Sequence, residues 1–272
     1  PELVEEVPEK AKALMEAFWP GPLTLIFRKT AIVPKETSGG LDTVAVRMPS
    51  DPVAHAFLKA CGLPVAAPSA NLSGRPSPTK ASHVIEDMDG RIACIIDGGD
   101  VPIGVESTIV DCTGETPVLL RPGYITAAQM EAVVGPIGTD PAITREAILS
   151  KKTVLRPKAP GMKYRHYAPK APVTVVSGEA EAVADYIRAH TGPATGILTT
   201  DEHIGAFREG VVLSAGKRSD PATIAHNLFS VLRAFDALSV KEIYSEDFTD
   251  VDIGTVIMNR LLKAAGGNII NV

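Results

Sequence analysis

The spacing of apolar residues predicts helices and short strands over the first half of the chain. Residues 8–19 carry apolar side chains at helical spacing, and Pro20 ends that helix. Asp51 and Pro52 form a typical helix start, with Asp as the cap and Pro at the first helical position. Further helices are expected at residues 81–88 and after Thr126, and strands at residues 23–27, 43–47, 65–67, 93–97, 108–111 and 118–120.

The pattern changes after residue 172, where short apolar strands alternate with helical segments. That order is typical of an open, mostly parallel sheet with helices on its faces. Between residues 136 and 171 the periodicity is lost, and repeated prolines predict a stiff, extended linker. The chain therefore reads as a two-domain α/β protein. Its second domain has strands at 173–176, 195–198, 211–214 and 242–244, and helices at 180–190, 221–238 and 254–265.

Composition narrows the class of protein. The 272 residues are 45% hydrophobic and 22% charged, as in an ordinary globular protein. No stretch reaches the ~20 apolar residues of a membrane span, and no secretory signal is visible, so we expect a cytoplasmic protein without a membrane partner. Cys61, Cys94 and Cys112 lie in apolar surroundings, which predicts reduced, buried cysteines. A formal charge of −5 argues against a general nucleic-acid coat but leaves a local basic patch open.

The densest group of polar residues is the segment 68–79, directly after an expected strand. Its hydroxyls, its amide and its loop N–H groups could form a cradle for phosphate or carboxylate oxygens. The same richness in Ser, Pro and Gly also describes a loop without a ligand. Both interpretations stay open on the residues alone.

Two arginines at strand ends are further candidates. Strand alternation puts Thr43 and Arg47 on one face, about 13 Å apart at ~3.3 Å per residue, which suits the two ends of an elongated ligand or a plain solvated surface. Arg121 precedes a Pro-Gly turn and is placed to grip phosphate. Glu106 and Asp111 are either ordinary satisfied carboxylates or contacts of a magnesium ion.

These groups include no Ser-His-Asp triad, metal cage or reactive cysteine. The inventory therefore favours an anion-binding α/β enzyme that acts by positioning and charge stabilisation, as nucleotidyl or phosphoryl transfer does. The second domain has neither GxGxxG nor GxxxxGK[ST], so a docking or regulatory role is favoured there over a nucleotide site.

Several of these segments resemble, in order, the motifs of the Sua5/YrdC family. They are residues 19–24 (WPGPLT), 44–49 (VAVRMP), 66–74 (AAPSANLSG), 106–111 (ESTIVD) and 120–123 (LRPG). Residues 160–169 (PGMKYRHYAP) are similar to the linker of the longer, two-domain Sua5 branch, and residues 258–267 (MNRLLKAAGG) to its C-terminal part. The resemblance implies a YrdC-like twisted mixed sheet with helices in residues 1–135, a linker at 136–171 that contacts the active site, and a smaller Rossmann-like α/β domain, the Sua5 C-terminal domain, at 172–272.

The resemblance also implies a reaction and its participants. L-threonine, bicarbonate and ATP with Mg²⁺ give L-threonylcarbamoyladenylate and pyrophosphate, which makes the enzyme a nucleotidyltransferase. The product is the precursor of the t6A modification at tRNA position 37, and the implied partner is the downstream tRNA threonylcarbamoyl transferase complex. No acid or base catalyst and no metal ligand is assigned. By motif, the resemblance implies that threonine is bound by Arg47, Ala67 and Ser107. It implies that ATP is bound by Thr43, Ser69, Asn71, Ser77, Arg121, His166 and Tyr167. Either His166 or Tyr167, both in the linker, would fold over the nucleotide.

One departure from the family and one alternative remain. Family members begin with a segment that carries a Thr-Asp-Thr-x-Tyr-Gly-Leu-like stretch and a Lys-x-Arg motif, and this chain starts after them. We therefore expect the chain as given to be weakly active or inactive. The alternative is a YrdC-like module that binds double-stranded RNA or tRNA without catalysis. The charge of −5 and the 5% aromatic content weigh against it, while weak RNA binding stays open.

Overall fold

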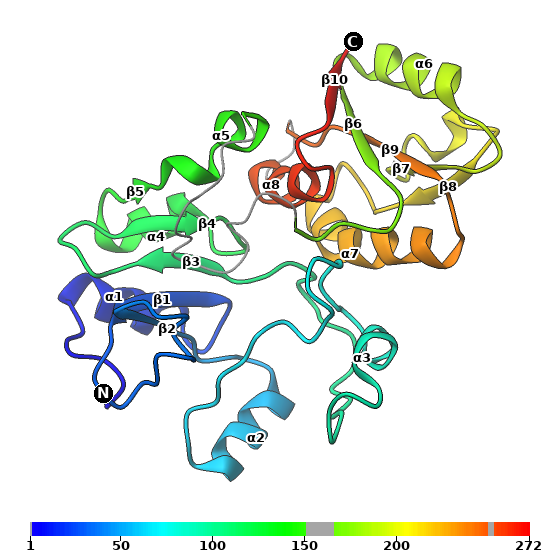
Figure 1. The fold of residues 1–272 in the computed structure, drawn as a ribbon. Coiled ribbons are helices and arrows are strands. Elements are labelled where there is room, and N and C mark those ends of the chain that lie inside the picture. The colour runs from blue at the N-terminus through cyan, green and yellow to red at the C-terminus, as the bar shows by residue number, and fades with distance from the viewer. Residues whose placement is uncertain (1, 151–165, 250–252) are drawn as a thin grey trace. The chain divides into compact units, whose positions relative to one another are not determined.

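The structure, a computed structural model, describes residues 2–150, 166–249 and 253–272 (Figure 1). The described residues fall into two compact units. Unit 1 contains residues 2–68 and 106–144, and unit 2 contains residues 69–105, 145–150 and the described residues from 166 onward. Within these ranges, no helix is both long and apolar enough to cross a bilayer.

Unit 1 is built on a five-stranded mixed sheet with the order β2-β1-β3-β4-β5 (Figure 1). The central strand β1 (Leu23–Arg28) pairs antiparallel with β2 (Thr43–Val46) and parallel with β3 (Thr108–Asp111). On the other side of β3, β4 (Val118–Arg121) is antiparallel, and the short β5 (Gly138–Thr139) pairs parallel with β4.

One face of this sheet packs against helices. Along β1, alternate side chains point to opposite faces, so Leu25 packs with Leu14 of α1 (Glu9–Phe18) and Met130 of α4 (Ala127–Val134). Thr126 caps α4 in a capping box with Gln129, as its type predicts. The opposite face carries a small apolar cluster of Ile26, Ile109 and Leu120. Thr24 is on this second face, two residues before Ile26.

Two of the expected strands do not form. Residues 65–67 and 93–97 have no regular secondary structure and pair with neither sheet of the described chain. Their apolar side chains are exposed, 44% for Val65 and 58% for Ile96. A short apolar run becomes a strand only where a neighbouring strand takes its backbone hydrogen bonds, and neither run has one here. The expected helices α2 (Pro52–Cys61) and α3 (Ala81–Met88) are confirmed.

The predicted linker is also more structured than its prolines indicated. Between residues 138 and 149 the chain forms β5, a 3₁₀ turn η1 (Pro141–Ile143) and α5 (Arg145–Leu149). The Asp140 side chain accepts a hydrogen bond from the Ala142 amide at 2.8 Å, which caps the turn. Elements of two to five residues are too short to show a period in sequence. Residues 151–165 lie outside the described chain.

The expectation that all three cysteines are buried is wrong for two of them. Cys112 is buried, and burial raises the pKa of its thiol to about 12. Cys61 and Cys94 are exposed. Cys61 ends α2, an amphipathic helix that buries none of its residues, and Cys94 follows α3 in a segment without regular structure.

We therefore expect two thiols to react rapidly with an alkylating reagent in the folded protein at about pH 8, where an ordinary thiol is partly ionised. The third thiol, Cys112, should react only after the protein unfolds, because its raised pKa and its burial both suppress the thiolate. Mass spectrometry of the labelled peptides measures this order. Rapid labelling of Cys112 in the native protein would contradict the structure.

Unit 2 contains the parallel sheet that the second half of the sequence predicts. Its order is β10-β6-β9-β7-β8, and every pairing is parallel (Figure 1). The three-residue β10 was not expected, because it is too short to show a pattern. The elements are β6 (Val173–Ser177), α6 (Ala180–His190), β7 (Thr195–Thr199), η2 (Ile204–Ala206), β8 (Val211–Ser214), α7 (Pro221–Ala237), β9 (Glu242–Glu246), α8 (Gly254–Ala264) and β10 (Ile269–Asn271).

Helix α7 has two buried sides. Its apolar side, with Leu228, Leu232 and Phe235, lies in the main core of unit 2. A polar side, with Ser230 and Arg233, contacts the segment of residues 69–105 that belongs to the same unit. A helix that buries a second, polar side must satisfy each of its polar groups there.

Candidate active site

Three polar side chains meet at one end of the unit 1 sheet. The hydroxyls of Thr24 and Ser107 are 2.8 Å apart and share a hydrogen bond. Arg121 donates from Nε and Nη2 to the carbonyl oxygen of Ser107, at 3.0 and 2.9 Å, and from Nη2 to the Ser107 hydroxyl at 3.2 Å. All three residues are buried. Arg121 thus uses its forked geometry to fix both the backbone and the hydroxyl of Ser107.

The strand register explains why these residues meet. β1 and β3 run parallel with Leu23 opposite Thr108, so Ser107, which directly precedes β3, comes beside the start of β1. Arg121 ends β4 opposite Ile109 of β3. The loop before β3 also lies close to Gly123, where a Cβ atom would be 2.4 Å from the Thr108 nitrogen. The Pro-Gly turn after Arg121 is therefore needed for close backbone approach.

Arg47 is brought to the same end of the sheet. Val46, the last residue of β2, pairs with Leu25, so Arg47, the residue after the strand, comes beside the part of β1 that carries Thr24. Thr43 pairs with Arg28 at the other end of the strand. Arg47 is exposed and makes no ion pair with any residue that the structure describes, and partial desolvation lowers the pKa of its guanidinium. An arginine stays charged at neutral pH even so, and it is available for an anion.

The other predicted site residues of unit 1 are less constrained. Ala67 is exposed in the segment after α2 that forms no strand. The Asp111 carboxylate accepts from the amide and the hydroxyl of Thr113, at 3.0 and 2.6 Å, so it is satisfied within its own turn. Across the described ranges, no group of three or more His, Cys, Asp or Glu side chains is arranged to hold a metal ion.

In unit 2, Asn71 organises the loop of residues 69–79. Its Nδ2 donates to the carbonyl oxygens of Leu72 and Arg75, at 2.8 and 3.3 Å. Its Oδ1 is buried without a hydrogen-bond partner, which leaves an acceptor for a donor group of a ligand. Ser69 is exposed and Ser77 is buried in the same loop.

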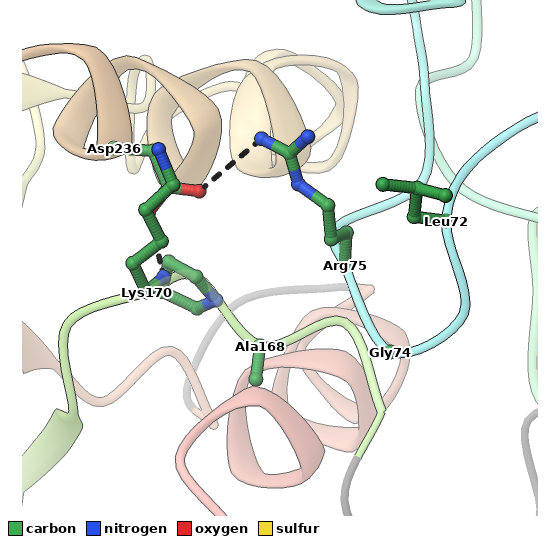
Figure 2. Close-up of a pocket in the computed structure, with 7 residues that line it drawn as sticks. Leu72, Gly74, Arg75, Ala168, Lys170 and Asp236 are labelled. Carbon is green, nitrogen blue, oxygen red and sulfur yellow. Dashed lines mark hydrogen bonds and ion pairs between the residues drawn. The ribbon is translucent and has the colours of Figure 1, made fainter. Parts of the chain in front are cut away.

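The end of the predicted linker motif and the residue that follows it lie beside this loop. The Ala168 amide donates to the Gly74 carbonyl oxygen at 2.8 Å, and the Lys170 amide donates to Asp236 Oδ1 at 2.7 Å. Figure 2 shows the cavity between them, with Arg75 pointing toward Asp236. The nearest charged atoms of Arg75 and Asp236 are 3.7 Å apart. The cavity measures about 570 Å³ and is lined by Leu72, Gly74, Arg75, Ala168, Pro169, Lys170 and Asp236.

Tyr167 is an anchor within unit 2. Only 2% of it is exposed, its ring centroid is 5.1 Å from that of Phe229, and the Arg260 guanidinium lies 5.9 Å from the ring centroid. The half-buried ring of His166 packs edge-on against it at 4.1 Å. The buried ring fixes the segment that carries both residues, and contact of either one with ATP stays a prediction.

Comparison with known proteins decides the family. A family model described as "Telomere recombination", of the Sua5, YciO and YrdC proteins, matches residues 1–123, and one described as "Threonylcarbamoyl-AMP synthase, C-terminal domain" matches residues 125–266. The chain is 49% identical to the threonylcarbamoyl-AMP synthase of Bacillus subtilis over 99% of its own length and 77% of that protein. The chain belongs to the threonylcarbamoyl-AMP synthase family.

Solved structures support the same family. The chain matches a structure of Pyrococcus abyssi Sua5 complexed with L-threonine, with a TM-score of 0.87 and 44% identity over 100% of this chain and 78% of that one. It also matches a P. abyssi Sua5 variant in which a histidine and a tyrosine are changed to alanine, with a TM-score of 0.88 and 43% identity over 100% of this chain and 77% of that one. The two-domain Sua5 type and its mixed α/β fold are thereby confirmed.

Sequence reasoning missed several polar residues in and around the candidate site of this member of the threonylcarbamoyl-AMP synthase family. Thr24 was taken as part of a strand, although its hydroxyl pairs with Ser107. Asp87 was not considered, although it bonds to Arg75 of the predicted nucleotide loop. The available signal in α7 was a set of polar residues spaced three or four positions apart, namely His226, Ser230 and Arg233, which lie along one side of the helix.

Proposed function

We propose that this chain forms threonylcarbamoyl-AMP and pyrophosphate from L-threonine, bicarbonate and ATP. The observation that carries the proposal is the cluster at one end of the unit 1 sheet. There Arg47, which forms no ion pair with any described residue, comes beside Thr24, which is bonded to Ser107. A free guanidinium beside two hydroxyls suits a small molecule with a carboxylate and a hydroxyl, as threonine is. The threonine-bound structure of the P. abyssi relative supports this assignment.

We assign the roles of the residues from the family motifs. Arg47 pairs with the threonine carboxylate, and Ser107, held by Arg121, contacts the rest of the amino acid near Ala67. Ser69, Asn71 and Ser77 contact the nucleotide from their loop, with Thr43, His166 and Tyr167 as further nucleotide contacts. Arg121 donates from its Nε and Nη2 to Ser107. We therefore propose that Arg121 affects ATP binding indirectly, by holding Ser107 in place.

The proposed reaction depends on the positioning of its substrates more than on acid or base catalysis. Bicarbonate takes up a proton and loses water to give carbon dioxide, and the threonine amine adds to the carbon dioxide and loses a proton to give a carbamate. A carbamate oxygen then forms a bond to the α-phosphorus of ATP, while the bond from that phosphorus to the bridging oxygen breaks and pyrophosphate leaves. Fixed donors stabilise the charge on the reacting oxygens, and a closed site keeps water from the adenylate.

Magnesium fits this site as a companion of ATP. The described residues provide no cluster of three ligating side chains, and Mg²⁺ at nucleotide sites keeps waters and phosphate oxygens as most of its ligands. When bound, it neutralises charge on the phosphates. We further propose that the product passes to a transferase that places the threonylcarbamoyl group on tRNA in the cytoplasm.

A pyrophosphate-release assay tests the proposal. Release should require threonine, bicarbonate and ATP together, and Arg47→Gln should raise the KM for threonine by at least about tenfold through loss of the charged partner. Arg28→Gln at the exposed end of β1 is the matched control and should leave this KM unchanged. Release that ignores threonine would contradict the proposal. A salt-sensitive affinity for tRNA without any pyrophosphate release would favour the RNA-binding alternative instead.

A further inference from the structure

The polar side of α7 follows the segment of residues 69–105 over two helical turns. His226, Ser230 and Arg233 are spaced at i, i+4 and i+7 and therefore lie along one side of the helix. His226 Nδ1 is 2.9 Å from the Pro102 carbonyl oxygen, and the Ser230 hydroxyl is 2.8 Å from that of Thr79. These contacts lie within unit 2 and join parts of the chain that are far apart in sequence.

Arg233 makes the most extensive of these contacts. Although charged, it is only 4% exposed. Its Nε and Nη2 donate to the Pro76 carbonyl oxygen at 3.1 and 2.7 Å, and its Nη1 and Nη2 donate to the Asp87 carboxylate at 3.3 and 2.7 Å. Pro76 directly precedes Ser77, one of the predicted nucleotide contacts. The guanidinium therefore holds the loop backbone directly before Ser77.

Asp87, on α3, holds the same loop from a second element. Its carboxylate accepts from the Leu72 amide at 3.2 Å and from Arg75 and Arg233. Leu72 directly follows Asn71, so the carboxylate holds the loop beside another of the predicted nucleotide contacts. Burial raises the pKa of Asp87, but the hydrogen bonds and charges of Arg233, Leu72 and Arg75 outweigh burial and hold it below its ordinary value.

The loop needs such support because its own backbone provides little. The backbone hydrogen bonds inside it run from Asn71 to Ser69 and from Arg75 to Leu72. Pro76 and Pro78 have no amide to donate, and Gly74 adopts a positive φ of 92°. A loop of this composition is mobile unless side chains from other elements fix it.

We propose that Arg233 of α7 and Asp87 of α3 are positioning residues that hold the loop of residues 69–79 in its ATP-binding conformation. The inference rests on the proposed function and extends it, because it gives the second-domain helix α7 a defined part in nucleotide binding. Asp87 and Arg233 hold the loop backbone at Leu72 and Pro76, between Asn71 and Ser77, without belonging to the nucleotide contacts themselves. Threonine binding, at the sheet end of unit 1, does not depend on them.

The test separates the two substrates. Arg233→Lys keeps the charge but loses the forked donors, so the Kd for ATP should rise at least about tenfold while the Kd for threonine stays within about twofold. Hydrogen exchange in the absence of ligand should become faster at the Leu72 and Arg75 amides. Ser230→Ala, which removes a single hydrogen bond and leaves the fold intact, should show the same changes at a smaller size.

Arg218→Lys is the matched control in the same unit. Arg218 is also an ion-paired arginine, bonded to Glu246 at 3.2 Å, but it does not contact the loop. It should lower stability without changing the Kd for ATP. Unchanged ATP binding and unchanged loop exchange in both Arg233→Lys and Ser230→Ala would overturn the inference. Absence of ATP and threonine binding in the unaltered chain would instead overturn the proposed function and the inference with it.

Discussion

Replacement of Arg121 by alanine is expected to weaken threonine binding by about 100-fold or more. Arg121 donates two hydrogen bonds to the Ser107 carbonyl oxygen and one to its hydroxyl, all in a buried site. Hydrogen bonds to charged groups contribute about 1.5–3 kcal/mol each, and a buried carbonyl left without a donor adds to the loss. Calorimetric titration with threonine measures the effect.

The conservative variant distinguishes geometry from charge. Arg121→Lys keeps the positive charge but cannot reach both the carbonyl and the hydroxyl of Ser107 with a planar fork, so it should recover only part of the affinity. Arg28→Ala, at the exposed end of β1, should leave the affinity unchanged. Full affinity in Arg121→Ala would show that Ser107 keeps its position without the arginine.

Replacement of Gly123 by alanine should have the largest effect on stability. A Cβ atom at this position would lie 2.4 Å from the Thr108 nitrogen, 2.7 Å from the Ser107 carbonyl carbon and 2.8 Å from the Glu106 oxygen. These are backbone atoms, so the clash cannot be relieved by a side-chain rotation. We expect the free energy of unfolding to fall by about 3 kcal/mol, measured by urea denaturation.

Gly114→Ala provides the control for Gly123→Ala. Gly114 is exposed in the turn between β3 and β4, and an added Cβ atom would meet nothing within 4 Å. Its free energy of unfolding should change by less than about 0.5 kcal/mol. An equal loss in both variants would mean that the loop before β3 does not pack against Gly123 as described.

Local signals in the sequence predicted the elements whose ends are marked by caps. Asp51 with Pro52 located α2, and its side chain accepts from the Ala54 amide as expected. Thr126 located α4 in the same way. Strands 65–67 and 93–97 failed because an apolar run specifies only that a segment can pair, and pairing depends on a partner strand elsewhere in the chain.

The site was predicted only in part, again because a sequence does not show which distant segments come together. Motifs placed Ser107, Arg47 and Arg121 in one site, and the strand register brings them to one end of the unit 1 sheet. The positioning residues were missed because a single sequence shows which side of α7 is polar but not whether solvent or another segment covers it. Arg233 and Ser230 look like residues of a solvated helix face, although both lie against residues more than a hundred positions earlier.

The contacts of α7 join residues that are far apart in sequence, and this separation affects when the protein becomes functional during its synthesis. Arg233 is 157 residues after Pro76 and 146 residues after Asp87. A chain leaving the ribosome exposes the loop of residues 69–79 long before α7 exists to hold it, and contacts of such separation form late in folding. ATP binding by this enzyme therefore matures only when the second half of the chain has been made, so an unfinished chain does not compete for the nucleotide.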